Sequence, residues 1–370
     1  MRVLHFASWY PSEAHDQLGN FVQRHIEAIA LNHPSAVVYA NPHTHPHIDM
    51  TTRAGVLECR AYVKDRKPRA WRVDMALERL VRRQVIPNWG RPDLVHLHVA
   101  AEAGDAALRW ARRWDVPLVV TEHWTAYHDA EGAAFTSKQA RRVRRVLGAA
   151  DRLAPVSQHL AQAMAPFASG TPSHVIPNVV DCDRFQLGAG SPPGGPMKFF
   201  HVSSLLEQQK NVFGLLEAFA SALDGGLSAE LFIAGSGDDA PYRVWAAEHH
   251  LVNHIHFLGR LDPTQVAHHM AHSDALVLFS RSENMPCVMV EAWSAGTPVI
   301  ATDVGGVAEF LTPENGALLP SEDRAALTDI MLNWDCSTRD RPAIRQFAET
   351  KFSRPAIAAA YAKLYSSITP

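Results

Sequence analysis

Short apolar runs alternate with amphipathic segments along the whole chain, and this alternation restricts the fold more than any other feature of the sequence. The segments between the apolar runs have helical spacing, for example 102–114 and 211–223. Strands that alternate with helices indicate parallel sheets with helical crossovers, so we expect an α/β protein. Apolar runs typical of buried strands include VLHFA at 3–7, LVHLHV at 94–99, HVIP at 174–177, MKFFHV at 197–202 and DALVLF at 274–279.

The length of 370 residues is enough for about two domains of ordinary size. Between the two halves, the segment GAGSPPGGP at 188–196 contains only Gly, Ala, Ser and Pro. Such a composition cannot build the interior of a helix or strand, so it predicts a linker. The sequence therefore predicts two similar α/β domains, 1–185 and 186–353, followed by a C-terminal helix within 354–370 that crosses back onto the first domain.

The two halves of the chain carry opposite charge. Residues 1–176 contain 22 Lys and Arg against 16 Asp and Glu, whereas residues 177–370 contain 13 against 22. Basic residues concentrate between Arg60 and Arg91, where apolar side chains such as Trp71 are interleaved, and in RRVRR at 141–145. These clusters are either solvated faces or a patch for anionic lipid or a phosphate-bearing acceptor.

The location of the protein is expected from what the sequence lacks. The N-terminal MRVLHFASWYP has one basic residue and no long apolar stretch, so we expect no signal peptide. No apolar run reaches the length of a membrane span. The four cysteines are scattered, which suits a reducing compartment. We expect a cytoplasmic protein, with a peripheral position at the inner face of the membrane as a second option.

Several familiar sites are missing from the sequence. There is no phosphate-binding G-x-x-x-x-G-K-[ST] loop, and GSG at 235–237 lacks the third glycine of a dinucleotide fingerprint. Two groups have metal-ligand chemistry: Asp181 with Asp183, and the alternating His43, His45 and His47. We regard metal binding at either group as the less favoured interpretation.

Two carboxylates bracket the start of a predicted helix in SENMPCVMVEAWSAG at 282–296. The helix should begin near Pro286, because Pro is preset for the first helical turn. Glu283 then precedes this turn, beside backbone N–H groups that favour anions, and Glu291 lies about five residues inside, about 10 Å away. A nucleoside diphosphate sugar has two hydroxyl-rich ends and matches this spacing. The alternative is a Glu before a helix cap and a second Glu on a solvent face.

The longer stretch SENMPCVMVEAWSAGTPVIATDVGGVAEF at 282–310 resembles the donor-site signature of family 4 glycosyltransferases, in which two Glu are separated by seven residues. This resemblance implies a GT-B fold, in which two Rossmann-like domains face each other across a cleft. The first domain would be the acceptor side and the second would bind the nucleotide sugar. Other segments that resemble the family are TEHW at 121–124, IPNVVDCDRF at 176–185, LFIAGSGDD at 231–239 and IHFLGRL at 255–261.

Carried over position by position, the resemblance assigns roles to five residues or segments. Glu283 would hold hydroxyls of the transferred sugar, together with the backbone of Asn284 and Met285. Glu291 would accept the ribose hydroxyls, and Lys210 would offset the charge of the departing diphosphate. His123 would meet the transferred sugar near its anomeric centre.

Other assignments concern the phosphates and the acceptor. Gly19 would let the backbone approach phosphate or acceptor closely, but many family members have a second glycine where this chain has Asn20. Many members also carry Arg six residues before the diphosphate Lys, where this chain has Ser204; Arg281 and Arg260 are candidates to replace its charge. His98, at the end of a predicted strand, is a candidate for the acceptor side, whereas His96 fits a core residue.

The resemblance implies a retaining hexosyltransferase that moves a sugar from a nucleotide diphosphate sugar to an acceptor hydroxyl. It implies no cofactor and no essential metal. Expected partners are the donor, a glycan or polyprenol-linked acceptor of cell-surface polysaccharide assembly, and an anionic membrane surface; nucleic acid is not expected. Two alternatives are a sugar-nucleotide epimerase or hydrolase of the same architecture, and a non-catalytic nucleotide-sugar-binding subunit.

Overall fold

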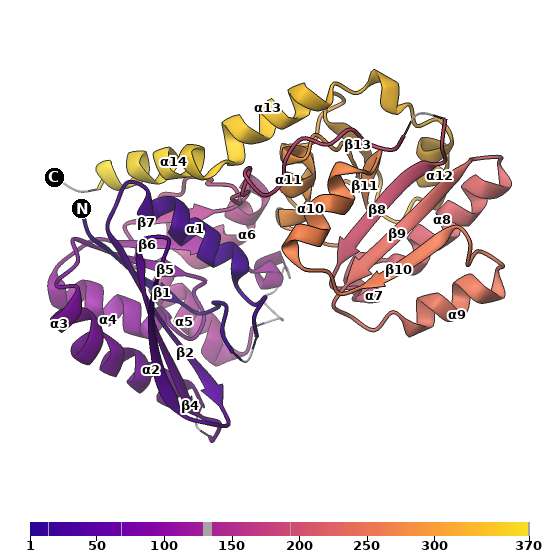
Figure 1. The fold of residues 1–370 in the computed structure, drawn as a ribbon. Coiled ribbons are helices and arrows are strands. Elements are labelled where there is room, and N and C mark those ends of the chain that lie inside the picture. Colours follow the sequence, from indigo (N-terminus) through magenta and orange to yellow (C-terminus); the bar gives the residue numbers. More distant parts are fainter. Residues whose placement is uncertain (14, 68, 129–134, 193, 369–370) are drawn as a thin grey trace. The chain divides into compact units, whose positions relative to one another are not determined.

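A computed structural model describes residues 1–13, 15–67, 69–128, 135–192 and 194–368, and the chain divides into two compact units (Figure 1). The first unit comprises Met1–Val179 and Arg354–Pro370, and the second comprises Val180–Ser353. The division falls six residues before the boundary predicted from the sequence. The C-terminal helix belongs to the first unit, although the chain just before it builds the second.

The first unit is built on a seven-stranded sheet with the order β3-β4-β2-β1-β5-β6-β7. All its strands are parallel except β3, which is antiparallel to β4. The strands are β1 (Val3–Ala7), β2 (Ser35–His43), β3 (His47–Arg53), β4 (Val56–Lys64), β5 (Leu94–His98), β6 (Leu118–Glu122) and β7 (Arg152–Pro155).

Helices cover both faces of this sheet. α1 and α14 pack together on one face and share a buried cluster with β1, β5 and β6. α2, α4 and α5 pack in series on the other face. The helices of this unit are α1 (Asn20–Ala30), α2 (Arg69–Leu80), α3 (Ile86–Asn88), α4 (Gly104–Trp114), α5 (Ser137–Leu147), α6 (Gln158–Ala168) and α14 (Arg354–Ser366).

The second unit has a six-stranded, wholly parallel sheet with the order β10-β9-β8-β11-β12-β13. Its strands are β8 (Met197–Ser203), β9 (Ala229–Gly235), β10 (Ile255–Gly259), β11 (Ala275–Leu278), β12 (Val299–Thr302) and β13 (Gly316–Leu319). Its helices are α7 (Glu207–Lys210), α8 (Val212–Asp224), α9 (Ala240–Glu248), α10 (Pro263–Ala271), α11 (Cys287–Ser294), α12 (Arg324–Leu332) and α13 (Arg341–Phe352).

Each sheet reverses its strand order once. In the first unit the chain builds outward from β1 towards β2 and then continues from β5 on the other side, and in the second unit it does the same from β8 to β9 and then β11. Open α/β sheets bind ligands beyond the carboxyl ends of the strands at such a point of reversal. The loops that follow β8 and β11, and those that follow β1 and β5, are therefore the places to look for a site.

The α/β class and most elements were predicted correctly, but β3, β4, β13, α13 and the short helix α7 were missed. β3 is an edge strand whose residues are almost all exposed, so it has no apolar alternation. β4 carries Glu58 and Arg60, which are buried and form an ion pair. Buried polar residues interrupt the apolar pattern by which a buried strand is predicted, so β4 was not predicted. The predicted strand HVIP at 174–177 does not belong to either sheet.

The segment 188–191, predicted to be part of a linker, is instead fastened to the second unit. The N–H groups of Gly188 and Gly190 donate to the carbonyls of Ala295 and Ala271. A Cβ at Gly188 would lie 1.9 Å from the Ala271 oxygen, so glycine is needed there for contact rather than for flexibility. Among the described residues, no helix has both the length and the apolar character needed to cross a bilayer.

Arg341 holds this segment in place, which gives a test of the fold. Its half-buried guanidinium donates to the carbonyls of Gly188, Ser273, Ala271 and Ala295 and to the hydroxyl of Thr297. Arg341→Met should lower the free energy of unfolding by about 2–4 kcal/mol, because all five hydrogen bonds of the guanidinium are lost.

The matched control is Arg324→Met, which removes an exposed ion pair with Glu217. It should cost no more than about 1 kcal/mol in chemical denaturation. Equal costs for the two variants would contradict the structural role of Arg341.

Candidate active site

The loops after β8 and β11 bring Lys210 and Glu283 together at the point of strand reversal in the second sheet. The Glu283 carboxylate accepts hydrogen bonds from Lys210 Nζ at 2.6 Å and from Ser280 Oγ at 2.8 Å. The side chain of Glu283 is buried, with 7% of its surface exposed. The two residues that sequence reasoning assigned to the sugar and to the diphosphate therefore form one ion pair.

Arg281 fastens the two loops to each other. Its guanidinium donates to the Glu207 carbonyl and to Asn211 Oδ1, and its Nε pairs with Glu322 at 2.7 Å. Its backbone N–H donates to the carbonyl of Gln209 at 2.8 Å. The sequence makes Arg281 a candidate ligand for the diphosphate, but its guanidinium holds the segment that carries Lys210. Arg260, the other candidate, is exposed.

The backbone of Glu283 and Asn284 packs against Gly305 and Gly306, two residues to which the sequence analysis assigned no role. A Cβ at Gly305, whose φ is +61°, would lie 1.7 Å from the Glu283 carbonyl oxygen. The N–H of Gly306 donates to the Asn284 carbonyl at 2.8 Å. Met285 beside them is 3% exposed. The glycine pair in TDVGG was the only signal in the sequence for this backbone contact.

Glu291 lies in α11, which begins at Cys287 after Pro286 in an extended conformation. This start agrees with the prediction. The Glu291 side chain is 5% exposed, so it does not lie on a solvent face. Ser204, after the end of β8, has a buried hydroxyl with no hydrogen-bond partner among the described residues. A buried hydroxyl without a partner is costly, and it is suited to receive a ligand atom.

In the first unit, Glu122 fixes the loop that carries His123. The buried Glu122 carboxylate accepts from the N–H groups of His123, Trp124 and Ala100 and from the hydroxyl of Tyr127, all at 2.9–3.0 Å. Burial raises the pKa of Glu122, and these four hydrogen bonds oppose that shift. Sequence reasoning singled out His123 in TEHW and missed the acid beside it.

The ring of His123 lies against Phe21 and His25 from α1, with ring centroids 4.6 and 5.0 Å apart. Burial, together with the nearby His25, lowers the pKa of His123 well below its ordinary value, and a hydrogen bond with Asn178 opposes this. His123 is therefore neutral at physiological pH, in a pocket of other aromatic rings.

A buried chain of hydrogen bonds starts at Asn178, next to His123. The donor and the acceptor of each bond follow from which atoms can donate. Asn178 Oδ1 can only accept, so His25 donates from Nε2 and accepts at Nδ1 from the Tyr361 hydroxyl. Tyr361 then accepts from Thr121 Oγ1, and Thr121 accepts from His96 Nε2. The neighbouring β5 and β6 strands are thus joined to α1 and α14 through side chains alone.

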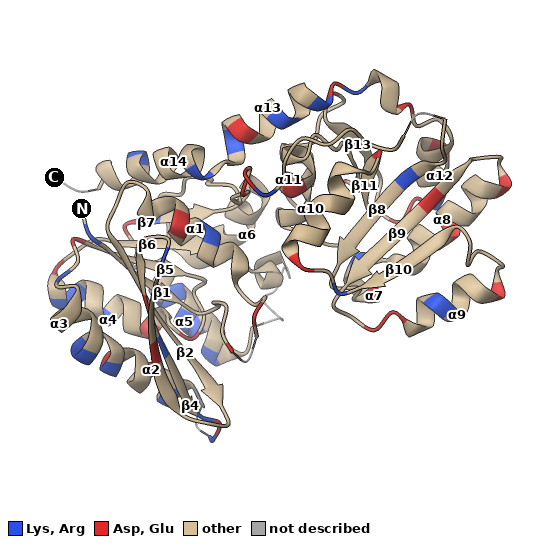
Figure 2. Cartoon of the chain, in the orientation of Figure 1, with Lys and Arg blue, Asp and Glu red and all other residues tan. Residues whose placement is uncertain are grey.

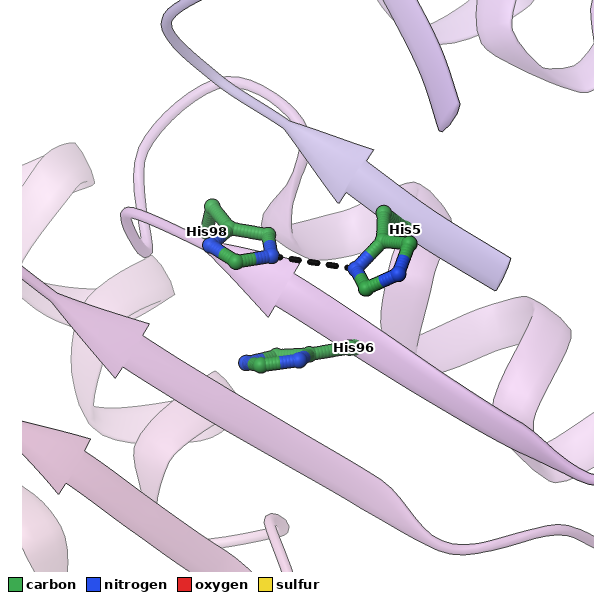
Figure 3. Close-up of side chains that lie close together, drawn as sticks. All are labelled: His5, His96 and His98. Atoms are coloured by element: carbon green, nitrogen blue, oxygen red, sulfur yellow. Dashed lines mark hydrogen bonds between the residues drawn. The ribbon is translucent and has the colours of Figure 1, made fainter. Parts of the chain in front are cut away.

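His98 belongs to a buried layer rather than to an exposed surface. Figure 3 shows His98 Nε2 and His5 Nδ1 directed at each other, and the two atoms are 3.1 Å apart. His96 stacks on His98 with ring centroids 4.2 Å apart. His98 has no exposed surface, so its ring does not contact an acceptor in the site as it stands. The interpretation of His96 as a satisfied core residue agrees with its two hydrogen bonds, to Tyr365 and Thr121.

The three histidines His5, His96 and His98 also have nitrogens within 4.8 Å of one another, the spacing of a metal site. A metal needs ring lone pairs that converge, but His96 and His98 are stacked at an interplanar angle of 27°. Both nitrogens of His96 are already hydrogen-bonded. The group is therefore better explained as part of the hydrogen-bonded layer.

The remaining predicted residues have local roles in the structure. Gly19 precedes α1 with φ +75°, and a Cβ there would lie 2.4 Å from the backbone of Trp9. The close approach that requires glycine is therefore to the chain itself. Asn20 begins α1, and its amide lies 3.5 Å from Gln17 Oε1. A role of these two residues towards phosphate or acceptor stays a prediction.

Comparison with known proteins decides the family. A model described as Glycosyltransferase Family 4 matches residues 19–184, and one described as Glycosyl transferases group 1 matches residues 188–345. The phosphatidyl-myo-inositol mannosyltransferase of Mycobacterium leprae is 31% identical over 264 residues, which cover 70% of this chain and 67% of that protein. The chain belongs to the family 4 glycosyltransferases.

Further relatives agree with this assignment. The glycogen synthase of Mycobacterium tuberculosis is 28% identical over 394 residues, covering 99% of this chain and 94% of the relative. Among solved structures, sucrose-phosphate synthase from Thermosynechococcus elongatus matches with a TM-score of 0.77 at 18% identity, over 99% of each chain. An Anabaena protein in complex with UDP and glucose matches with a TM-score of 0.72 at 17% identity, over 99% of this chain and 100% of that one. The fold of this glycosyltransferase is therefore of the GT-B type.

The contact between Gly305 and the Glu283 backbone gives a prediction with a matched control. Gly305→Ala places a methyl group into the Glu283 carbonyl, whereas Gly259→Ala, at a similar φ of +66°, meets nothing within 4 Å. Both variants pay for the positive φ, which costs about 1 kcal/mol. Only Gly305→Ala should also displace Glu283, lower glycosyl transfer at least tenfold and weaken nucleotide-sugar binding. Equal activity of the two variants would show that the Glu283 backbone position does not matter.

The buried histidines predict sensitivity to acid. Burial lowers the pKa of His25 to about 4, below its ordinary value of 6.5, and burial followed by the nearby His33 lowers that of His5 to about 3. The unfolded chain therefore binds more protons than the folded one below pH 6.5. The contribution of His25 is complete above pH 6.5 and is lost as the pH falls to about 4, by about 3 kcal/mol.

Chemical denaturation at a series of pH values measures this loss. His25→Gln should flatten the fall of the free energy of unfolding between pH 6.5 and 4. The same change at exposed His174 should leave the curve as in the parent protein. A His25→Gln curve as steep as the parent's would contradict the burial of a neutral His25.

Proposed function

We propose that this glycosyltransferase transfers a sugar from a nucleotide diphosphate sugar to an acceptor hydroxyl with retention of the anomeric configuration. The single observation that best supports the donor class is the ion pair of Lys210 and Glu283 at the point of strand reversal. A nucleotide sugar carries both kinds of group that this pair would bind: the diphosphate for the ammonium and sugar hydroxyls for the carboxylate.

The ion pair also stabilises its two members against each other. Both side chains are largely withdrawn from water, so each would be costly to leave alone. In the proposed complex, the diphosphate takes over Lys210 and the sugar hydroxyls donate to Glu283. Ser280 continues to donate to the Glu283 carboxylate, which keeps the carboxylate oriented. Ser204 adds a hydroxyl that has no hydrogen-bond partner within the described part of the chain, in place of the Arg that many relatives carry.

Glu291 is proposed to bind the other end of the donor. Its side chain is buried in α11, on the same chain segment as Glu283. An ionised carboxylate accepts two hydrogen bonds side by side, which suits the two neighbouring hydroxyls of a ribose.

The proposed chemistry is a displacement on one face of the sugar. The bond between the anomeric carbon and the diphosphate oxygen breaks, and its electron pair leaves with the diphosphate. The acceptor oxygen forms the new bond to the anomeric carbon from the same face, and its proton passes to the departing phosphate oxygen. Lys210 lowers the barrier by offsetting the negative charge that develops on the leaving group. The proposal includes no cofactor and no essential metal.

The proposed acceptor is a lipid-linked or phosphate-bearing glycan of cell-surface polysaccharide assembly. Its support is the basic character of the first unit, which carries 22 Lys and Arg within residues 1–176. The relative from Mycobacterium leprae is named for an inositol phospholipid, a phosphate-bearing acceptor. The protein would then act at the cytoplasmic face of the membrane as a peripheral enzyme.

The experiment that tests the proposed function is a thermal-shift panel of UDP-, GDP- and ADP-sugars, followed by product analysis. A ligand at 100 times its dissociation constant stabilises the protein by about 2.7 kcal/mol, so one nucleotide should stand out. The chosen donor is then incubated with and without acceptor. Conversion of the sugar without acceptor would indicate an epimerase or hydrolase, and binding without turnover across acceptors would indicate a non-catalytic subunit.

Lys210→Ala should lower turnover at least 10²-fold, because the leaving diphosphate loses the cation proposed to offset its charge. The control is Lys351→Ala, which removes an exposed lysine from the same unit. Steady-state rates with saturating donor measure the effect. Near-parent turnover in Lys210→Ala would assign the stabilisation of the leaving group to another residue.

A further inference from the structure

A groove with a volume of about 950 Å³ lies in the first unit between α2 and the strands β3 and β4. Ala61 and Val63 of β4 line it, with Ile48 of β3 on one side and Trp71 and Met75 of α2 on the other. It contains none of the residues of the candidate active site. This groove is therefore a separate feature that the proposed reaction does not yet use.

The groove exists because the sheet extends beyond its covering helix. α2 packs on β2 and β4, whereas β3 is paired beyond β4 at the edge and is left open. Three large apolar side chains remain in water there: Ile48 is 41% exposed, Met75 49% and Trp71 57%. Contiguous exposed apolar side chains of this size mark a binding surface more often than a plain exterior.

Basic side chains surround this apolar surface. Lys64, Arg72, Arg79 and Arg83 line the groove, and within the described ranges none of them is ion-paired to a carboxylate. The lining acid, Glu78, is paired with Arg82 at 2.7 Å. Figure 2 shows Lys and Arg recurring on the helices of this face of the unit. The groove thus combines an apolar floor with a rim of uncompensated positive charge.

A π-helical turn at Val81–Val85 shapes the basic end of the groove. The N–H of Ile86 donates to the Val81 carbonyl, five residues back, just before Pro87, which has no N–H to donate. The wider turn accommodates this proline within the helix. Arg82 and Arg83 lie in this turn, and both are exposed and line the groove.

We propose that this groove binds a single phosphate-bearing lipid of the membrane. The lipid chain lies against Ile48, Trp71 and Met75, and its phosphate lies among Arg79, Arg83 and Lys64. A soluble phosphate would use the rim but would leave the apolar floor in water. Trp is also suited to the boundary between lipid headgroups and chains. Only the role of the bound lipid rests on the proposed function: the lipid would hold the enzyme at the membrane, where lipid-linked acceptors are.

The second basic cluster, on α5, serves as a control. Arg142 and Arg145 both contact Asp105, and Arg144 lies over the ring of Phe167. These arginines are engaged within the unit, and none of them lines the groove. The composition of the sequence did not distinguish the two clusters, whereas the structure favours α2 for lipid.

The test is co-sedimentation of the full chain with vesicles of phosphatidylcholine, with and without phosphatidylglycerol, in the absence of any donor. The parent protein should bind only the vesicles that contain phosphatidylglycerol. The double variant Arg79→Glu with Arg83→Glu should weaken this binding at least tenfold. The double variant Arg141→Glu with Arg144→Glu makes the same change of charge on α5 and should stay within threefold of the parent.

A third double variant, Trp71→Ser with Met75→Ser, tests the apolar floor at exposed positions and should also weaken binding at least tenfold. If the α2 and α5 charge variants lose vesicle binding equally, the proposed groove site is wrong, and the general positive charge of the unit explains the binding. Full binding by the Trp71 and Met75 variant, or displacement by inorganic phosphate at constant ionic strength, would overturn the lipid in favour of a soluble anion.

The thermal shift given by the nucleotide sugar separates this inference from the proposed function. All the variants should keep that shift, because none of them changes a residue proposed to bind the donor. Loss of vesicle binding with an intact donor shift supports the groove. A parent protein that binds vesicles through the groove but responds to no nucleotide sugar would contradict the proposed function and leave the groove standing.

Discussion

Lys210 and Glu283 are 73 positions apart in the sequence, and their contact depends on the parallel pairing of β8 with β11. That pairing places the loops after both strands at one edge of the sheet, where the strand order reverses. Arg281 then fixes the two loops to each other, so that the lysine and the carboxylate meet at a defined distance. Gly305 completes the arrangement, because only a residue without a Cβ lets the Glu283 backbone rest on it. The candidate donor site is thus a consequence of sheet topology and of a few polar contacts that hold its loops.

The first unit is held together by a buried chain of hydrogen bonds. Its sheet and two of its helices are joined by buried imidazoles, hydroxyls and one amide that hydrogen-bond in a single direction. Such a chain contributes little net stability, but it is costly to leave half-satisfied, so it favours one arrangement of α1 and α14 over others. His123 lies at one end of the chain, next to His25 and Asn178. Glu122 holds the backbone of the same histidine. The surroundings of His123 therefore join the C-terminal helix to the loop that carries this histidine.

Much of this structure could be predicted from the sequence, and the failures have physical causes. Strands such as β1 and β8 are apolar runs, and α11 begins where Pro286 indicates, because burial and proline geometry act locally. β3 was missed since an exposed edge strand needs no apolar residues. The segment after Gly188 was taken for a linker, because composition does not distinguish a free glycine from one pressed against a carbonyl. Among candidate site residues, a motif proposed Glu283, Glu291 and Lys210. It did not indicate Gly305 or Glu122, nor the role of Arg281 in holding the loops, since these depend on contacts between distant segments. His98 was placed at a strand end correctly, but its burial beneath His5 and His96 could not be read from its position.

The most direct test of the central claim is the structure of the enzyme in complex with its nucleotide sugar. The diphosphate should lie on Lys210, with that lysine released from Glu283, and the Glu283 carboxylate should accept from hydroxyls of the sugar. The ribose hydroxyls should lie on Glu291. A nucleotide bound elsewhere, with the contact between Lys210 and Glu283 unchanged, would contradict the claim that this pair is the donor site.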